Sequence, residues 1–181
     1  KENNKLFLVC NYSLIGMPWC EDNINSISDY SWENSLVRYY LNNNFYNNHF
    51  TEEEKKYILQ TNINTTELEK SIGFNDTIDY FFLLTEDEYY SLYPLRSLIT
   101  CNFTGCLWSS LSDEWFSQSY DLNNITYTYW TRDARIYRYD NDIIFEGQNC
   151  ISSDGTLSWE SDTSEYWGIR PCVWLDCSNI N

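Results

Sequence analysis

Residue types that act as nucleophiles are present in this sequence, but the base that would activate them is scarce. The chain carries seven cysteines and many serines, whereas His49 is its single histidine. A cysteine or serine nucleophile ordinarily needs an adjacent general base, most often a histidine. His49 lies in the asparagine-rich run NNNFYNNHF, where a surface or capping role is the simpler interpretation. We therefore predict no catalytic residue and a protein that is not an enzyme.

The cysteines do not have the spacing of a metal site. No two of them form a C-x-x-C pair, and one histidine cannot complete a Cys2His2 zinc site. Seven cysteines are many for a reducing compartment, so disulfides in an oxidising compartment are the favoured interpretation. Their pairing stays open, and buried free thiols that pack like small apolar side chains are the alternative. The cysteines are Cys10, Cys20, Cys101, Cys106, Cys150, Cys172 and Cys177.

Acidic residues dominate the charge of the chain. There are 27 aspartates and glutamates against 11 lysines and arginines, which gives a net charge of −16. Nucleic acids and anionic membranes bind basic surfaces, so neither is an expected partner. The sequence contains no run of about 18 apolar residues, the length that would be needed to span a bilayer. Carboxylates are so frequent that EDE (86–88) and SDEW (112–115) cannot be singled out as a catalytic pair.

No cofactor or metal is predicted. The triplet DND at 140–142 is a weak calcium candidate, because calcium takes carboxylate and amide oxygens. Asp and Asn are also typical of hairpin turns, which is the simpler interpretation of this triplet. The sequence contains no glycine-rich phosphate-binding loop.

A candidate binding surface lies in YTYWTRDARIYRY, residues 127–139. This segment alternates aromatic residues with arginines in an otherwise acidic chain, and Tyr, Trp and Arg dominate binding hot spots. A strand pair with tyrosines in the core and arginines neutralising nearby acids is the alternative. The predicted ligand-binding residues are Tyr127, Tyr129, Arg135, Tyr137, Arg138 and Tyr139, together with Trp167.

Periodicity predicts a single α+β domain over residues 1–181. An apolar face at Val37, Tyr40, Leu41 and Phe45 indicates a helix that the asparagine run ends. Capping boxes at 51–54 and 85–88 predict two further helices, the first reaching about residue 60. Strands are expected at 6–10, 81–85, 125–132, 134–139 and 142–147, a turn at 152–155, and a closing strand in GIRPCVWLD.

Four segments, taken in order, resemble an uncharacterised bacterial domain family of surface and secreted proteins. They are WENSLVRYYLNNNFYNNHFTEEEKKYI (32–58), DYFFLLTEDEYYSLY (79–93), YWTRDA (129–134), and SSDGTL (152–157) with YWGIRPCVWLD (166–176). The family is similar to the C-type-lectin-like superfold, which also contains formylglycine-generating enzymes and hypervariable receptors. The resemblance implies a C-type-lectin-like α+β fold, with two early helices packed on short twisted antiparallel strands and long irregular loops. It implies no activity.

The matching positions in the C-terminal half imply structural roles. These signature residues are Trp130, Arg132, Gly155, Gly168, Arg170, Pro171 and Trp174. Buried arginines must be paired, so we expect Arg170 to meet a buried carboxylate. The chain departs from the family pattern at Thr131, Asp133, Ala134 and Cys172. The thiol of Cys172 suggests a local cross-link to Cys177 or Cys150.

Three hypotheses about function follow. The leading one is a non-catalytic ligand-binding domain, secreted or on the cell surface and part of a larger protein. It would recognise a glycan or a protein, and a diversified receptor is a sub-hypothesis. The second is a formylglycine-generating type of oxidase, with Cys172 and Cys177 as a conceivable metal-binding pair. The third is a purely structural module. Asn-x-Ser/Thr sequons at Asn11, Asn64, Asn75, Asn102 and Asn124 carry glycans only if the host glycosylates.

Overall fold

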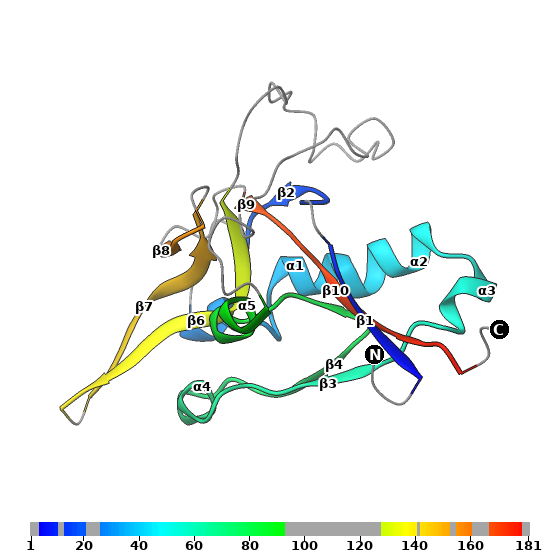
Figure 1. The fold of residues 1–181 in the computed structure, drawn as a ribbon. Coiled ribbons are helices and arrows are strands. Elements are labelled where there is room, and N and C mark those ends of the chain that lie inside the picture. Colours follow the sequence, from blue (N-terminus) through cyan, green and yellow to red (C-terminus); the bar gives the residue numbers. More distant parts are fainter. Residues whose placement is uncertain are drawn as a thin grey trace, which may run out of the picture.

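The computed structural model describes residues 4–10, 13–20, 26–92, 128–140, 142–152, 155–160 and 167–178. These residues form a mixed α+β fold, as the sequence predicts. Figure 1 shows the main helical segment crossing behind the paired strands β1 (Lys5–Val9) and β10 (Cys172–Asp176), while a long hairpin projects away from them.

The described strands form three sheets, with the orders β1-β10-β5, β2-β9-β6-β7-β8 and β3-β4. The other strands are β2 (Gly16–Met17), β3 (Thr61–Ile63), β4 (Thr77–Asp79), β5 (Phe81–Phe82), β6 (Tyr129–Tyr139), β7 (Asp142–Ile151), β8 (Leu157–Glu160) and β9 (Trp167–Gly168). The helical elements are η1 (Ile27–Tyr30), α1 (Leu36–Tyr39), η2 (Tyr40–Phe45), α2 (Tyr46–His49), α3 (Glu52–Lys55), α4 (Glu67–Ser71) and α5 (Glu86–Leu92).

Strand β10 is the central strand of the first sheet. Trp174 pairs with Phe7 of β1, and Cys172 pairs with Phe82 of β5. Since side chains alternate along a strand, Phe7, Trp174 and Phe82 lie on one face. Phe81 points the other way, against the helical segment, where its ring packs 5.2 Å from Phe45. The sheet therefore separates a helix-covered face from a face carrying three aromatic rings.

The helical segment α1–η2–α2 is continuous from Leu36 to His49, with a π-helical stretch in its middle. Val37, Leu41 and Phe45 are buried, which confirms the predicted apolar face. The asparagine run does not end the helix at once, because Asn42 is fixed by tertiary hydrogen bonds. Its side chain accepts from the backbone N–H of Tyr80 and Phe81 and donates to the Phe81 carbonyl at 2.8 Å.

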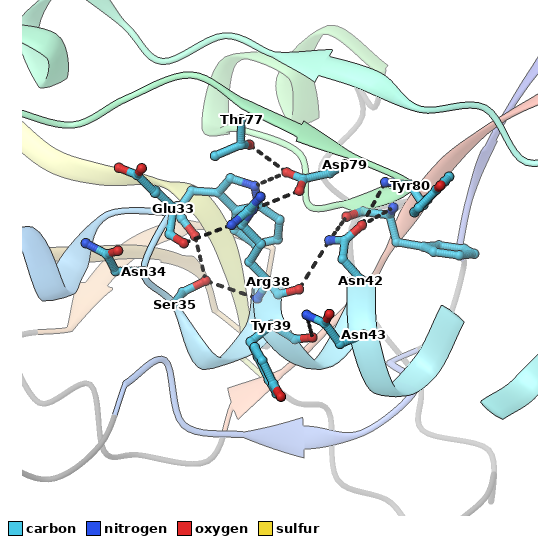
Figure 2. Close-up of polar contacts among 12 residues, drawn as sticks. Glu33, Asn34, Ser35, Arg38, Tyr39, Asn42, Asn43, Thr77, Asp79 and Tyr80 are labelled. Atoms are coloured by element: carbon cyan, nitrogen blue, oxygen red, sulfur yellow. Dashed lines mark hydrogen bonds and ion pairs between the residues drawn. The ribbon is translucent and has the colours of Figure 1, made fainter. Parts of the chain in front are cut away.

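A buried carboxylate fixes the start of this helix to β4 (Figure 2). The Asp79 side chain accepts hydrogen bonds from Trp32 Nε1 at 2.8 Å, Arg38 Nε at 2.8 Å and Thr77 Oγ1 at 2.6 Å. The Asp79 side chain is fully buried, whereas Arg38 is partly exposed. Ser35 caps the helix through Arg38 N–H. The W-x-x-S-x-x-R spacing thus places Trp32 and Arg38 beside the Asp79 carboxylate, while Ser35 between them caps the helix.

The capping boxes at 51–54 and 85–88 are confirmed. The helix after the first box is shorter than predicted and ends at Lys55. Residues 57–59 pair with β10 instead, through Leu59 N–H to the Trp174 carbonyl and Asp176 N–H to the Tyr57 carbonyl. Backbone pairing with the sheet therefore takes over where the exposed helix would have continued.

The two strands predicted at 125–132 and 134–139 are one strand over the described residues, β6, which pairs with β7 in a twisted hairpin with irregular register. Asp140 has a φ of 52° in the connection between Tyr139 and Asp142, as a tight hairpin turn requires. In the turn before β8, Gly155 has a φ of 81°, and its N–H donates to the Ser152 carbonyl.

Removal of the Asp79 carboxylate tests how much the hydrogen bonds that it accepts stabilise the fold. We expect Asp79→Ala to lower the free energy of unfolding by about 3 kcal/mol, because three donors and the Arg38 charge lose their acceptor. Urea denaturation followed by tryptophan fluorescence measures the change. Lys56→Ala, which removes only an exposed ion pair with Glu53, is the matched control and should leave the urea midpoint unchanged. Equal stability of the two variants would contradict this role.

Candidate functional site

The predicted ligand-binding residues separate into exposed and buried groups. Tyr137 and Tyr139 are exposed near the tip of the β6–β7 hairpin, as is Arg138. Arg135 forms a 3.5 Å ion pair with Glu146, and Tyr137 Oη donates to the same carboxylate at 3.1 Å. Trp167 is partly buried on β9. Tyr127 lies outside the described residues.

Tyr129 is not on the surface, contrary to our prediction. It is completely buried, with its ring 5.2 Å from Tyr89 and 4.9 Å from the guanidinium of Arg170. Arg170 is itself 2% exposed and donates from Nε to the Cys10 carbonyl at 3.0 Å. A bulky cation stacked on tyrosine rings fills this part of the core. Tyr129 is therefore a packing residue beneath the hairpin.

Several signature residues lie where local geometry restricts the choice of side chain. Trp130 is buried and donates from Nε1 to the Met17 carbonyl at 3.0 Å. A Cβ on Gly168 would lie 2.2 Å from Ser13 Oγ, so only glycine fits without rearrangement. The Pro171 carbonyl accepts from Cys10 N–H at 2.9 Å, which joins the closing segment to β1.

Arg132 joins β6 to the start of α5. Its guanidinium donates to the Leu83 carbonyl at 2.8 Å and forms a bidentate pair with the carboxylate of Glu88, at 2.8 Å for Nη2 to Oε1. Burial alone would raise the pKa of Glu88, but its bonds to Arg132 and Thr85 outweigh this and hold the pKa below its ordinary 4.5. The pair is therefore ionised, with no net charge, at neutral pH.

The pair borders a cavity of about 620 Å³ that the sequence analysis did not identify. The cavity lies between the aromatic face of the first sheet, the β3 segment and helix α5. Its volume is in the range of small-molecule binding sites. It is lined by Phe7, Thr61, Asn62, Ile63, Asn64, Phe82, Leu84, Asp87, Glu88, Ser91, Leu92, Arg132 and Trp174.

Three aromatic rings form the floor of this cavity. The Phe7 ring lies 4.8 Å from Trp174 at an interplanar angle of 35°, and 6.1 Å from Phe82 at 19°. Phe82 is buried, whereas Phe7 and Trp174 are partly exposed. The rings come from β1, β10 and β5, so the floor exists only once these distant segments have paired.

Polar side chains form the rim. Asn62 donates from Nδ2 to Asn64 Oδ1 at 2.8 Å, which leaves one amide oxygen and one amide nitrogen without a bond to any described residue. Asp87 and Ser91 are exposed on α5, and the side chain of neither makes a hydrogen bond with a described residue. The cavity thus combines an aromatic floor with open hydrogen-bonding capacity. The sequence did not reveal this cavity, because its Asn and Asp residues have no spacing that is typical of a binding site.

A second buried acid lies beside the pair, outside the large cavity. Asp133 accepts from Glu86 N–H at 3.0 Å and from Asn149 Nδ2 at 2.9 Å. Burial raises the pKa of Asp133 although these hydrogen bonds act in the opposite direction. The aspartate that departs from the family pattern thus connects β6, β7 and α5.

No disulfide joins any two of the described cysteines. The expected cross-link of Cys172 to Cys177 or Cys150 is therefore wrong. Cys172 and Cys177 are five residues apart along an extended strand, about 16 Å, whereas bridged Cα atoms lie within about 7 Å. The same separation prevents these two thiols from sharing a metal ion, as the oxidase hypothesis would need. Cys101 and Cys106 lie outside the described residues.

The described residues contain no cluster of three or more histidine, cysteine, aspartate or glutamate side chains placed to bind a metal ion. Asp140 and Asp142 flank the hairpin turn, and Asn141 lies outside the described residues. Within the same ranges, no helix has the length and apolar character needed to cross a membrane.

Residues 3–177 match the family described as "Domain of unknown function (DUF6273)". The chain belongs to this family. No curated protein and no solved structure matches the chain. The DUF6273 match covers all four segments that carry the resemblance. It gives no evidence for the C-type-lectin-like superfold.

The two carboxylates at the β6–α5 contact predict opposite effects of pH. Glu88 has a lowered pKa, so it stabilises the fold above about pH 5 and loses this effect as the pH falls. Asp133 has a raised pKa, so the fold binds its proton more tightly and gains stability as the pH falls toward 3.8. Urea midpoints between pH 3.5 and 7 should fall less steeply on acidification for Glu88→Gln, and more steeply for Asp133→Asn, than for the wild type. Parallel profiles would contradict both assignments.

The described thiols should differ in reactivity. Burial raises the pKa of Cys150 to about 12 and also raises that of Cys172, so both remain protonated and inaccessible at pH 8. Cys177 is partly exposed after β10. In native protein, iodoacetamide should label Cys177 at least about tenfold faster than the two buried thiols. Peptide mass spectrometry measures the rates, and a disulfide-linked peptide containing Cys172 would contradict the assignment.

Proposed function

We propose that this chain is a non-catalytic ligand-binding domain, secreted or displayed on a cell surface as part of a larger protein. Its ligand is a glycan or a protein segment, bound in the cavity between α5, the β3 segment and the aromatic face of β1-β10-β5. The proposal includes a C-type-lectin-like fold, supported by the order of the four signature segments and by the mixed α+β architecture with largely antiparallel strands.

The observation that carries this proposal is the composition of the cavity. Ligand sites are mostly apolar pockets with a small number of polar groups that fix orientation. Here the floor is Phe7, Phe82 and Trp174, and the rim offers Asn62 and Asp87. The floor belongs to a stable central sheet, so the site is largely preformed, which lowers the entropic cost of binding.

The arrangement of charged groups supports binding without catalysis. Of the two carboxylates lining the cavity, Glu88 is held in a bidentate pair by Arg132. A glycosidase needs two available carboxylates on opposite sides of its substrate. His49 lies on α2, where its ring packs 5.2 Å from Phe45. The described cavity therefore offers recognition groups and a single unpaired acid.

The projecting hairpin supports a second candidate surface for a protein partner. Tyr137 and Tyr139 expose large aromatic areas beyond the body of the domain, and Arg138 lies between them. Exposed tyrosine and arginine are typical of protein interfaces. In a diversified receptor, these positions would vary between copies of the gene. Tyr137, Arg138 and Tyr139 of the hairpin do not line the cavity, so the two surfaces can be tested separately.

A glycan-array screen of the purified chain, in calcium and again in EDTA, tests the proposed function. We expect binding that EDTA leaves unchanged, because calcium needs several convergent oxygen ligands and the cavity has one unpaired carboxylate. Asp87→Ala should reduce the signal by about tenfold, since it removes a charged hydrogen-bond acceptor. Glu53→Ala, which removes an exposed acid on α3 away from both the cavity and the hairpin, is the matched control.

Other results would move the binding site or contradict the proposed function. Loss of binding with Tyr137→Ala, but not with Asp87→Ala, would move the site to the hairpin. Binding abolished by EDTA would contradict the calcium-independent cavity. If neither glycans nor captured proteins bind, the chain is a structural module and the proposed function fails.

A further inference from the structure

The arrangement of the aromatic rings in the cavity indicates the shape of its ligand. The rings of Phe82, Phe7 and Trp174 are close to parallel, at interplanar angles of 19° and 35°, and Phe7 lies near both of the others. A box that encloses a quaternary ammonium group needs rings that stand at steep angles around the cation. Near-parallel rings instead suit a flat ligand that continues the stack with one apolar face. The C–H face of a sugar ring has this property.

The hydrogen-bonding groups on the rim indicate a ligand that both donates and accepts. Asn62 and Asn64 bond to each other and leave one amide oxygen and one amide nitrogen facing no described partner. Asp87 adds a carboxylate acceptor, and Ser91 adds a hydroxyl that can do both. Hydroxyl groups in pairs satisfy such a mixed set, because each one can donate to one neighbour and accept from the next.

The charge of the cavity argues against an anionic ligand. Arg132 is the single cation among the lining residues, and Glu88 neutralises it. Asp87 then leaves a net charge of −1 within a chain of net charge −16. Sulfated, sialylated and uronic-acid glycans would be repelled. A cationic ligand would be attracted to Asp87, but the three near-parallel rings provide no enclosure for it.

We propose that the cavity binds a neutral saccharide, with one sugar ring stacked on the partly exposed ring of Trp174. Its hydroxyl groups then bond to Asn62, Asn64 and Asp87. This inference rests on the proposed function, ligand recognition in the cavity. It adds the chemical class of the ligand and the residues that select it.

The sequon at Asn64 determines how the protein must be prepared. Asn64 lines the cavity and is followed by Thr65 and Thr66, so an N-linked glycan on its side chain would occupy the site. The test therefore uses protein from a bacterial host without N-glycosylation. The same protein with a glycan on Asn64 should not bind, which provides an internal control.

The experiment sorts array glycans by charge and repeats the screen with two variants. We expect hits among neutral oligosaccharides, and a loss of about tenfold with Asn62→Ala or Asp87→Ala. Asn48→Ala, an exposed asparagine on α2, and Glu53→Ala, an exposed acid on α3, are the controls and should bind like the wild type. A matched pair of probes separates neutral from cationic ligands: the trimer of N-acetylglucosamine and the trimer of glucosamine have the same linkage and differ in charge.

Every outcome is decisive. Neutral hits that weaken only with the cavity variants support the inference. Hits confined to charged glycans would overturn the neutral class while keeping the cavity as the site. A protein ligand lost with Asp87→Ala, without any glycan hit, would overturn the saccharide and keep the proposed function. Binding lost only with Tyr137→Ala would overturn both. Thermal unfolding of each variant verifies that Asn62→Ala and Asp87→Ala, both at exposed positions, remain folded.

Discussion

The Asp79 carboxylate is a buried charge, and the hydrogen bonds that it accepts hold the surrounding elements in place. An ionised carboxylate without partners is very unfavourable in an apolar interior, so its hydrogen-bond donors must come from the surrounding elements. They come from the residues before α1, from α1 itself and from β4. With Asn42 bonded to the backbone at 80–81, this fixes the helical segment against the strand that leads into β5. The position of β5 in turn determines where Phe82 lies on the cavity floor.

The second organising contact is between β6 and α5. Arg132, Glu88 and the Thr85 cap fix the first turn of a helix only seven residues long, which would be unstable alone. The free side of that helix carries Asp87 and Ser91 into the cavity rim. Residues with a structural role thus support the residues proposed to bind ligand. Substitution of Arg132 should therefore affect binding through the position of α5.

Local signals predicted part of this structure. The apolar face at Val37, Leu41 and Phe45 and the two capping boxes depend on residues within a few positions of one another, and they were recognised correctly. The cavity could not be predicted, because Phe7, Phe82 and Trp174 are far apart in the sequence and meet through strand pairing. We predicted Tyr129 on the surface because the alternation of side chains shows which side of a strand a residue faces. It does not show whether other elements cover that side. Here Tyr89 and the Arg170 guanidinium cover it.

The central position of β10 has a consequence for how the protein folds. This strand is among the last described residues of the chain, yet it lies between β1 and β5. A ribosome delivers residues 172–176 after every described segment that they pair with, so the first sheet cannot close until this strand has been made. Pairing across such a sequence separation is also slow, because a long loop must close before the contacts form. The cavity floor is completed in the same step, since it includes Trp174. Closure of the first sheet and completion of the proposed ligand site are then a single event.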